Sequence, residues 1–445
     1  MHLAPPVACY DKAVETPPLI QPVLVFNEPA EPSHDVTAVA PAPSVPLRVN
    51  LEDDDVAPLA FSLTQSQQQA NYDVSNDNDE APVIESASLR GEARFFNPQH
   101  CASRAVMGME FSPLRADLLL VAYSALDADA ATDWQLASDP EGSALLWSLL
   151  SSSSSSAESA QPEKVFECEW ALTCCAWSMN GLVAIAGAVN GAICMWDVRS
   201  PSSRPVHVVQ GAHVFPVVGL VCAATLTSLS SDGKLCQWDA AALNDNTEAW
   251  RPSASVELTW EKREVGACCL ALVGEDILVG CEAGVVYRVT LSDGVVSATR
   301  RHDGPVTSVC FWPHPSSTRL MLSSSFDWTC AVHAGARSSS ASASNMVAHA
   351  GFSPVHPGVF ASVDADGKLT LWAHAKGEWA AATSVAASPF ALRRLAWTRD
   401  GARVCTGSTR GVVRVFAVLA EELSMRGSTT QRERERIETA WSAAV

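Results

Sequence analysis

Two groups of histidine, serine and aspartate side chains in this sequence could do chemistry together. In each group a histidine is followed by a serine and, two residues later, by an aspartate: His213, Ser230 and Asp232 with Trp238 nearby, and His302, Ser325 and Asp327. A histidine with such partners can transfer protons, or it can link strands as a buried hydrogen-bonding group. Because both groups recur at the same place in a repeated unit, we predict a structural role. A catalytic role for His213 or His302 is the alternative.

Patterns that mark common enzyme classes are absent from the sequence. It has no glycine-rich phosphate loop, no G-x-G-x-x-G after a strand, no H-E-x-x-H and no G-x-S-x-G. Asp364 and Asp366 fall in a predicted turn, where a glycosidase-type pair is the alternative that nothing favours. The run 53–55 lacks the glycine and distal glutamate of a calcium loop. We therefore predict a binding protein that is not an enzyme and needs no cofactor or metal ion.

The 14 cysteines contain no C-x-x-C pair. The doublets Cys174-Cys175 and Cys268-Cys269 lie in apolar, strand-like runs, and adjacent side chains of a strand point to opposite faces. Such doublets cannot readily hold one ion, so we predict buried free thiols that behave as small apolar side chains. A structural zinc site is the alternative.

The elements that position these residues form a repeat. From Arg104 onward, a turn residue, four strand residues and one further, mostly large residue recur in that order seven times. The last residues of the seven copies are 39 to 51 residues apart: Trp147, Trp196, Trp238, Val289, His333, Trp372 and Phe416. This period is that of a WD40 blade, about 40–45 residues. The sequence therefore predicts an all-β fold, a seven-bladed WD40 β-propeller at 101–420.

An apolar run precedes each copy and predicts the first strand of its blade. The seven runs are 106–111, 173–177, 217–221, 267–272, 306–311, 347–352 and 392–397. A closed ring leaves no exposed sheet edge, and we expect residues 92–96 to supply the outer strand of the last blade. The serine-rich runs at 151–156 and 338–344 are predicted to be flexible loops.

The ends of the chain differ from the repeat. Residues 1–100 hold 13 of the 26 prolines, 15 acidic residues and four basic residues. Proline breaks helices and sheets, and excess charge opposes collapse, so we predict a disordered, acidic, Pro-rich arm at 1–100. Residues 421–445 are predicted to be a solvated tail, with 431–445 able to form a short helix through spaced charge pairs.

Composition argues against two classes of partner. The 49 acidic residues outnumber the 30 basic ones, and the net charge of −19 does not suit a nucleic-acid or anionic-membrane surface. The longest apolar stretch, 181–196, is too short to span a bilayer, and residues 1–20 lack the pattern of a signal peptide. We expect a soluble, intracellular protein with no nucleic-acid partner and no membrane insertion.

Five segments resemble one WD-repeat family, the dynein intermediate chains, and its cytoplasmic members most. Residues 323–329 read Ser-Ser-Ser-Phe-Asp-Trp-Thr and resemble the family's Ser-Ser-Phe-Asp-Trp-Thr, in which a Trp takes the place of the usual turn glycine. The other four segments are 118–123 with 139–142, 230–238, 302–307 and 351–372. Two features depart from the family. His333 stands where a Leu-Trp ending is usual, and residues 1–100 lack the Lys- and Glu-rich helix that binds dynactin.

The resemblance implies a role in assembly. The propeller would bind the tail of a dynein heavy chain, and the arm would bind dimeric dynein light chains, which would pair two arms. Thr64, Gln65 and Ser66 are close to the Thr-Gln-Thr core that adds a strand to a light chain. Trp328 is our candidate for a heavy-chain contact, with packing against a neighbouring blade as its alternative. A dynactin contact would be made differently or not at all.

The function predicted from the resemblance is that of a non-catalytic intermediate chain of a dynein motor complex. It would support minus-end-directed transport in the cytoplasm, on the microtubule cytoskeleton. An axonemal or intraflagellar-transport intermediate chain, located in a cilium or flagellum, is one alternative. A general WD-repeat scaffold or adaptor is the other.

Overall fold

The computed structural model describes the part of the chain that carries the repeat. The described residues are 88–125, 142–150, 160–239, 251–260, 263–290, 294–314, 319–335, 337–375, 377–419 and 430–442. All of them belong to one compact unit, Asn78–Val445. The predicted light-chain segment, Thr64 to Ser66, lies outside the described residues.

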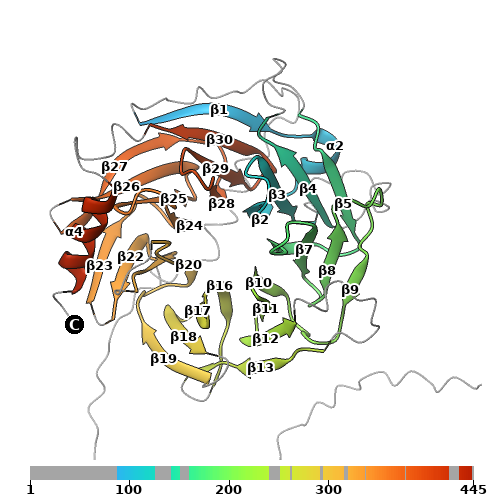
Figure 1. Cartoon of the computed structure of the whole chain (residues 1–445), viewed down its shortest axis with the longest axis horizontal. Coiled ribbons are helices and arrows are strands. Elements are labelled where there is room, and N and C mark those ends of the chain that lie inside the picture. The colour runs from blue at the N-terminus through green and yellow to red at the C-terminus, as the bar shows by residue number, and fades with distance from the viewer. Residues whose placement is uncertain are drawn as a thin grey trace, which may run out of the picture. The chain divides into compact units, whose positions relative to one another are not determined.

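Seven four-stranded antiparallel sheets surround a central channel, which confirms the predicted seven-bladed propeller (Figure 1). In six sheets the strands follow chain order from the channel outward, and we name them a, b, c and d. The a strands are β2 (Val106–Phe111), β6 (Leu172–Trp177), β10 (Val217–Cys222), β16 (Ala267–Val273), β20 (Val306–Phe311), β24 (Val347–Phe352) and β28 (Leu392–Trp397). The b strands are β3 (Leu118–Tyr123), β7 (Val183–Ala188), β11 (Thr225–Ser230), β17 (Asp276–Cys281), β21 (Met321–Ser325), β25 (Val359–Asp364) and β29 (Arg403–Ser408).

The outer strands complete each sheet. The c strands are β4 (Gly142–Ser148), β8 (Ile193–Asp197), β12 (Lys234–Asp239), β18 (Val285–Thr290), β22 (Thr329–Ala334), β26 (Lys368–Ala375) and β30 (Val413–Val418). The d strands are β5 (Lys164–Cys168), β9 (His207–Val209), β13 (Ala254–Glu257), β19 (Gly294–Arg300), β23 (Arg337–Ser342), β27 (Glu378–Ala386) and β1 (Leu89–Phe95). A short hairpin, β14 (Thr259–Trp260) with β15 (Arg263–Glu264), joins the third and fourth sheets.

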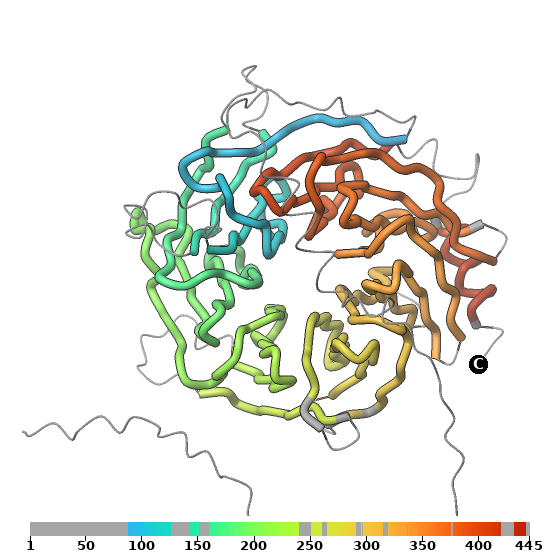
Figure 2. The backbone as a smooth tube through the Cα atoms, turned by 180° about the vertical axis from the view of Figure 1, so that it is seen from behind, coloured from blue at the N-terminus to red at the C-terminus, as the bar shows by residue number. Residues whose placement is uncertain are grey.

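The seventh sheet closes the ring with the N-terminal strand, as the sequence predicts. β1 pairs antiparallel with β30, and Leu89 lies opposite Val418 while Phe95 lies opposite Val413 (Figure 2). The strand begins three residues before the predicted segment 92–96. A one-turn helix, α2 (Pro98–Cys101), follows, and the Asn97 side chain caps it by accepting a hydrogen bond from the Gln99 amide at 3.0 Å. The propeller therefore includes residues 89–101, which corrects the predicted disordered arm at 1–100 over its last residues.

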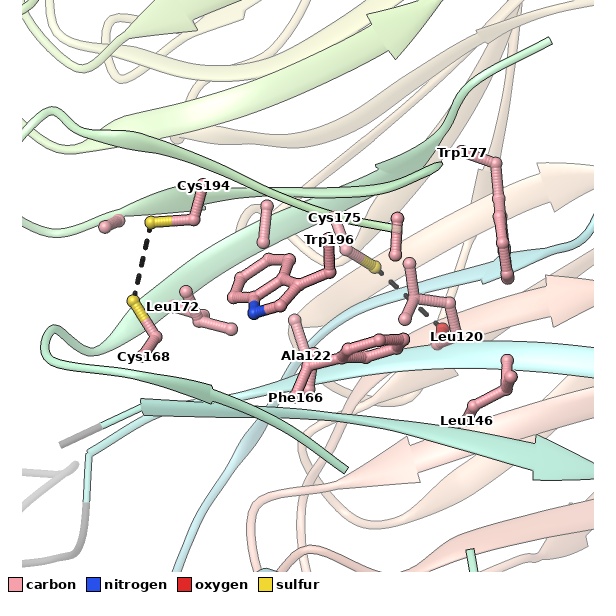
Figure 3. Close-up of a cluster of buried hydrophobic side chains, with 14 of the residues drawn as sticks. Leu120, Ala122, Leu146, Phe166, Cys168, Leu172, Cys175, Trp177, Cys194 and Trp196 are labelled. Atoms are coloured by element: carbon pink, nitrogen blue, oxygen red, sulfur yellow. Dashed lines mark hydrogen bonds between the residues drawn. The ribbon is translucent and has the colours of Figure 1, made fainter. Parts of the chain in front are cut away.

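The core lies between neighbouring sheets. Between the first two sheets, Phe166 of β5 and Trp196 of β8 pack with their ring centroids 5.6 Å apart, beside the thiols of Cys168 and Cys194 (Figure 3). Such aromatic side chains bury a large apolar area at this interface. All 13 cysteines of the described residues are free thiols, and ten of them are buried.

Each of the seven a strands has a register shift between its first and third residues. Such a β-bulge leaves one residue unpaired and turns the local side chains in a new direction. Because all seven a strands line the channel, the seven bulges place equivalent residues around it.

Two segments that the sequence assigns to loops or tail are ordered elements. The sequence predicts a loop for the serine-rich run 338–344, but most of this run forms β23, where Cys330 of β22 lies opposite Ala341. Backbone pairing does not depend on side-chain type, so a serine run can serve as an outer strand when only one of its residues, here Ala341, has to be buried.

The prediction of a solvated tail at 421–445 is corrected in part. Within it, α4 (Thr430–Ser442) packs on the propeller beside β23 and β27 (Figure 1). Ile437 and Trp441 are completely buried in the cluster between the fifth and sixth sheets. The Arg337 guanidinium lies 4.7 Å from the centre of the Trp441 ring and donates a hydrogen bond to the Ala440 carbonyl. None of the described helices is both long and apolar enough to cross a bilayer.

Candidate functional site: a protein-binding face

One face of the propeller is built from two kinds of connection. The turns between strands b and c, and the connections from strand d to the next strand a, meet at the same end of each sheet. The backbone of Phe215, in the β9–β10 connection, lies against Gly191 in the β7–β8 turn, and Phe390 lies against Gly367 in the same way. At these two points a d–a connection packs directly against a b–c turn.

The exposed large apolar residues of this face include all the exposed aromatic residues of the described chain. We call this set the aromatic face. Its members are Val189, Val214, Phe215, Phe326, Trp328 and Phe390. Among the described residues, the large apolar side chains exposed on the opposite face are not aromatic, and Met179 and Leu114 are examples. Aromatic residues are enriched where proteins bind other proteins, so this face is the candidate for a protein contact.

Trp328 has the most unusual backbone of the aromatic face. It occupies the b–c turn of the fifth sheet with φ of 69°, and its relative exposure is 52%. Five of the other b–c turns have a glycine at this position, with φ from 75° to 83°: Gly191, Gly233, Gly284, Gly367 and Gly411. A bulky residue in the left-handed region is strained, and such strain is often found at functional positions.

The carboxylate of Asp327 holds this turn in place. One oxygen accepts hydrogen bonds from the Thr329 amide at 3.0 Å and its hydroxyl at 2.6 Å. The other accepts from the Asp303 amide and from His302 Nδ1, each at 3.0 Å. Burial alone would raise the pKa of Asp327, but the hydrogen bonds from Thr329 and Asp303 and the neighbouring His302 lower it overall. Ionised Asp327 therefore links the residue after Trp328 to the β19–β20 connection that contains His302 and Asp303.

A hydrogen-bond chain continues from this turn into the sheet. His302 Nε2 lies 2.7 Å from the Ser323 hydroxyl, which lies 2.7 Å from His333 Nε2. Burial lowers the pKa of His302 despite Asp327, and it lowers the pKa of His333 to about 3, so both rings are neutral at pH 7. His333 thus supplies the ring N–H that an indole supplies to a serine in the third and sixth sheets.

The third sheet has the same arrangement. His213 Nε2 lies 2.7 Å from the Ser228 hydroxyl, and Trp238 Nε1 donates to this hydroxyl at 2.8 Å. The predicted partners Ser230 and Asp232 bind elsewhere. Ser230 donates to the Phe215 carbonyl at 3.2 Å, and Asp232 accepts from the Lys234 amide at 3.1 Å.

In both sheets, the serine that binds the histidine therefore lies two residues before the predicted serine. The histidine reaches Ser228 rather than Ser230, and Ser323 rather than Ser325, although it does meet Asp327 as predicted. The physical reason is depth. The histidine enters from the d–a connection and extends to the interior of strand b, whereas Ser230 and Ser325 end that strand at the turn.

The chain of Ser323, His302 and Asp327 has the order of a hydrolytic triad but not its accessibility. Ser323 is 1% exposed and His302 3% exposed, and the Ser323 hydroxyl is shared between two histidines. A nucleophile must reach a substrate, so this geometry suits a structural link. No cluster of three or more His, Cys, Asp or Glu side chains suitable for a metal ion occurs among the described residues.

The exchange of Ser228 for alanine should lower the free energy of unfolding by about 2–4 kcal/mol, because it removes the hydroxyl that His213 and Trp238 share in the core. Ser230→Ala is the matched control. Ser230 is equally buried but makes one bond to a carbonyl, so its loss should cost about 1 kcal/mol. Chemical denaturation measures both values, and equal losses would contradict the observed network.

The sequence of this chain is similar to those of known proteins. The model of the WD40 family (WD domain, G-beta repeat) matches residues 160–197. The chain is 29% identical over 354 residues to the cytoplasmic dynein 1 intermediate chain of Drosophila melanogaster, covering 74% of this chain and 50% of that protein. It is 26% identical over 299 residues to the ciliary dynein intermediate chain 3 of Heliocidaris crassispina, covering 63% and 49%.

The similarity to the dynein intermediate chains confirms the resemblance predicted from the sequence, and the cytoplasmic relative is the more similar of these two. The chain spans about half the length of the curated relatives it matches. Among solved structures, a chain of the crystal structure of the mitotic checkpoint complex matches with a TM-score of 0.58 and 19% identity, covering 78% of this chain and 99% of that one. That likeness concerns the fold alone.

Proposed function

We propose that this homologue of the dynein intermediate chains is a non-catalytic subunit of a dynein motor complex. The observation that carries the proposal is the similarity to the cytoplasmic dynein 1 intermediate chain over 74% of this chain. The complex would act in the cytoplasm on microtubules and support minus-end-directed transport. Affinity purification followed by mass spectrometry tests the proposal, which fails if no dynein heavy chain or light chain co-purifies.

The heavy-chain tail would bind the aromatic face. Exposed aromatic side chains in rigid turns lose little conformational freedom on binding, which makes them suitable anchors for a protein partner. Trp328 and Phe326 occupy one turn that Asp327 holds rigid, and Arg410 lies 5.7 Å from the ring of Phe390 at a second turn. This arrangement supports a binding role for Trp328 rather than packing against a neighbouring blade, since half of its side chain is exposed.

The arm would bind light chains through Thr64, Gln65 and Ser66, and dimeric light chains would pair two copies of the subunit. A dynactin contact through residues 1–100 would need a sequence other than the family's charged helix. The ciliary relative supports an axonemal or intraflagellar-transport complex as the second candidate. Heavy-chain peptides in the purified complex distinguish the cytoplasmic and ciliary candidates, and a general scaffold would bring down neither.

Deletion of residues 1–87 should abolish light-chain binding and leave heavy-chain binding unchanged. This deletion ends before β1, whereas removal of residues 1–100 would also take away the outer strand of the seventh sheet and open the ring. Pull-down of each partner from cell extract, with Thr64→Ala/Gln65→Ala as the matched full-length control, measures the effect. Loss of both partners on deletion of 1–87 would contradict this division of roles.

A further inference from the structure

The central channel holds a cavity of about 210 Å³ that the seven bulged a strands line. The third residue of each a strand, just after the register shift, contributes to its wall. These seven equivalent residues are Gly108, Cys174, Gly219, Cys269, Ser308, His349 and Arg394. Five of them are small, so the cavity has room, and Arg394 is the cation of the set.

The guanidinium of Arg394 is incompletely paired. Its Nε donates a hydrogen bond to the Met107 carbonyl of the neighbouring sheet at 2.6 Å. Its two Nη atoms have no hydrogen-bond acceptor within the described residues, and no carboxylate of these residues lies within 4.0 Å of them. A charge that is partly removed from water without a partner is costly, which points to an anion at this place.

The rest of the wall offers Arg394 little negative charge. Burial raises the pKa of the Cys174 thiol to about 11 and that of Cys268 to about 12, so these thiols are protonated at pH 7. Glu110 also lines the cavity, but its carboxylate accepts the Trp177 amide at 2.9 Å, and desolvation inside the channel raises its pKa to about 7. About half of the Glu110 side chains are therefore neutral at pH 7, and Glu110 makes no ion pair with Arg394 in the described structure.

His349 provides a second group that lacks a partner. Its Nδ1 is buried and has no hydrogen-bond partner in the described structure. Desolvation and the charge of Arg394 lower the pKa of His349 to about 3, so the ring is neutral and can donate one hydrogen bond without adding charge. Arg394 and His349 belong to the seventh and sixth sheets, which are adjacent in the ring.

We propose that this cavity binds a small tetrahedral oxyanion of the inorganic phosphate or sulfate class. The two Nη atoms of Arg394 would hold two of its oxygens, because the planar fork of a guanidinium matches such an anion. The neutral His349 ring, which also lines the cavity, would donate one hydrogen bond to a third oxygen. The cavity has several times the volume of one water molecule, about 30 Å³, so it admits the anion with part of its hydration. This site does not depend on assembly with a motor.

Isothermal titration of the full-length protein with sodium phosphate, at ionic strength held constant with chloride, tests the proposal. Saturable binding of one phosphate per chain is expected. Arg394→Met should weaken it at least about tenfold, the effect of losing a charged hydrogen-bonding group. Arg393→Met is the matched control, because this neighbour on the same strand carries the same charge but is not among the residues that line the cavity. It should change the dissociation constant less than about twofold.

Direct binding is measured in place of thermal stability because phosphate and sulfate stabilise proteins without a site. If Arg394→Met does not fold, Arg394→Lys replaces it: the charge remains, the fork is lost, and weaker binding is again expected. His349→Ala should also weaken binding, by a smaller factor. The proposal is overturned if the unmodified protein shows no saturable binding, or if Arg393→Met weakens binding as much as the Arg394 variants do.

Discussion

Replacement of Trp441 by alanine should lower the free energy of unfolding by about 3–5 kcal/mol. Trp441 anchors α4 in the cluster between the fifth and sixth sheets, where its side chain is fully buried beside Ile437. Its ring also lies against the Arg337 guanidinium. Without the indole, α4 loses its largest apolar contact, and a helix of 13 residues has little stability in water on its own. The fifth and sixth sheets would then expose apolar surface.

Chemical denaturation, with limited proteolysis of α4, measures this effect. Trp441→Phe is the matched control. The indole N–H is buried and has no hydrogen-bond partner within the described residues, so phenylalanine keeps most of the apolar contact and removes an unsatisfied donor. We expect the Trp441→Phe protein to stay within about 1.5 kcal/mol of the unmodified protein. Unchanged stability and unchanged proteolysis of Trp441→Ala would show that α4 does not hold the propeller.

The sequence predicts the ring well because the repeat specifies it several times over. The sequence predicts each a strand within one residue of its observed bounds, because a short apolar run between turn residues is a clear signal for a buried strand. The closing strand was found for a different reason. A propeller needs a partner for β30, and few segments near the N-terminus could supply one.

The features that the sequence does not predict depend on contacts between segments that are far apart in the chain. Ser228 and Ser230 both alternate inward on β11, and only the depth of His213 decides between them. The docking of α4 depends on Ile437 and Trp441 meeting a gap between two sheets, about 100 residues from Arg337 in sequence. The aromatic face could not be predicted for the same reason, since the sequence does not show which turns lie at the same end of the sheets. The cavity around Arg394 could not be predicted either, because the sequence does not show that the bulges of all seven a strands lie at the same level of the channel.

Replacement of Trp328 by glycine should affect stability and binding in opposite directions. Glycine adopts a φ of 69° without strain, whereas a residue with a side chain pays about 1–2 kcal/mol in the left-handed region. The Asp327 hydrogen bonds that hold the turn use the backbone of Thr329 and Asp303 and remain in place. Relief of the strain exceeds the loss of contacts from a half-exposed side chain, so we expect the free energy of unfolding to rise by up to about 1 kcal/mol.

Heavy-chain binding should become at least about 30-fold weaker in the same protein, because an exposed aromatic anchor contributes about 2 kcal/mol or more to a protein interface. Binding of a recombinant heavy-chain tail, measured by biolayer interferometry, gives the ratio. Met179→Ala is the matched control, since it removes a similarly exposed apolar side chain from the opposite face and should leave binding unchanged. A purely structural Trp328 would give the reverse pattern, with lower stability and unchanged binding. The signs of the two changes therefore decide whether the strain at Trp328 is maintained for a partner.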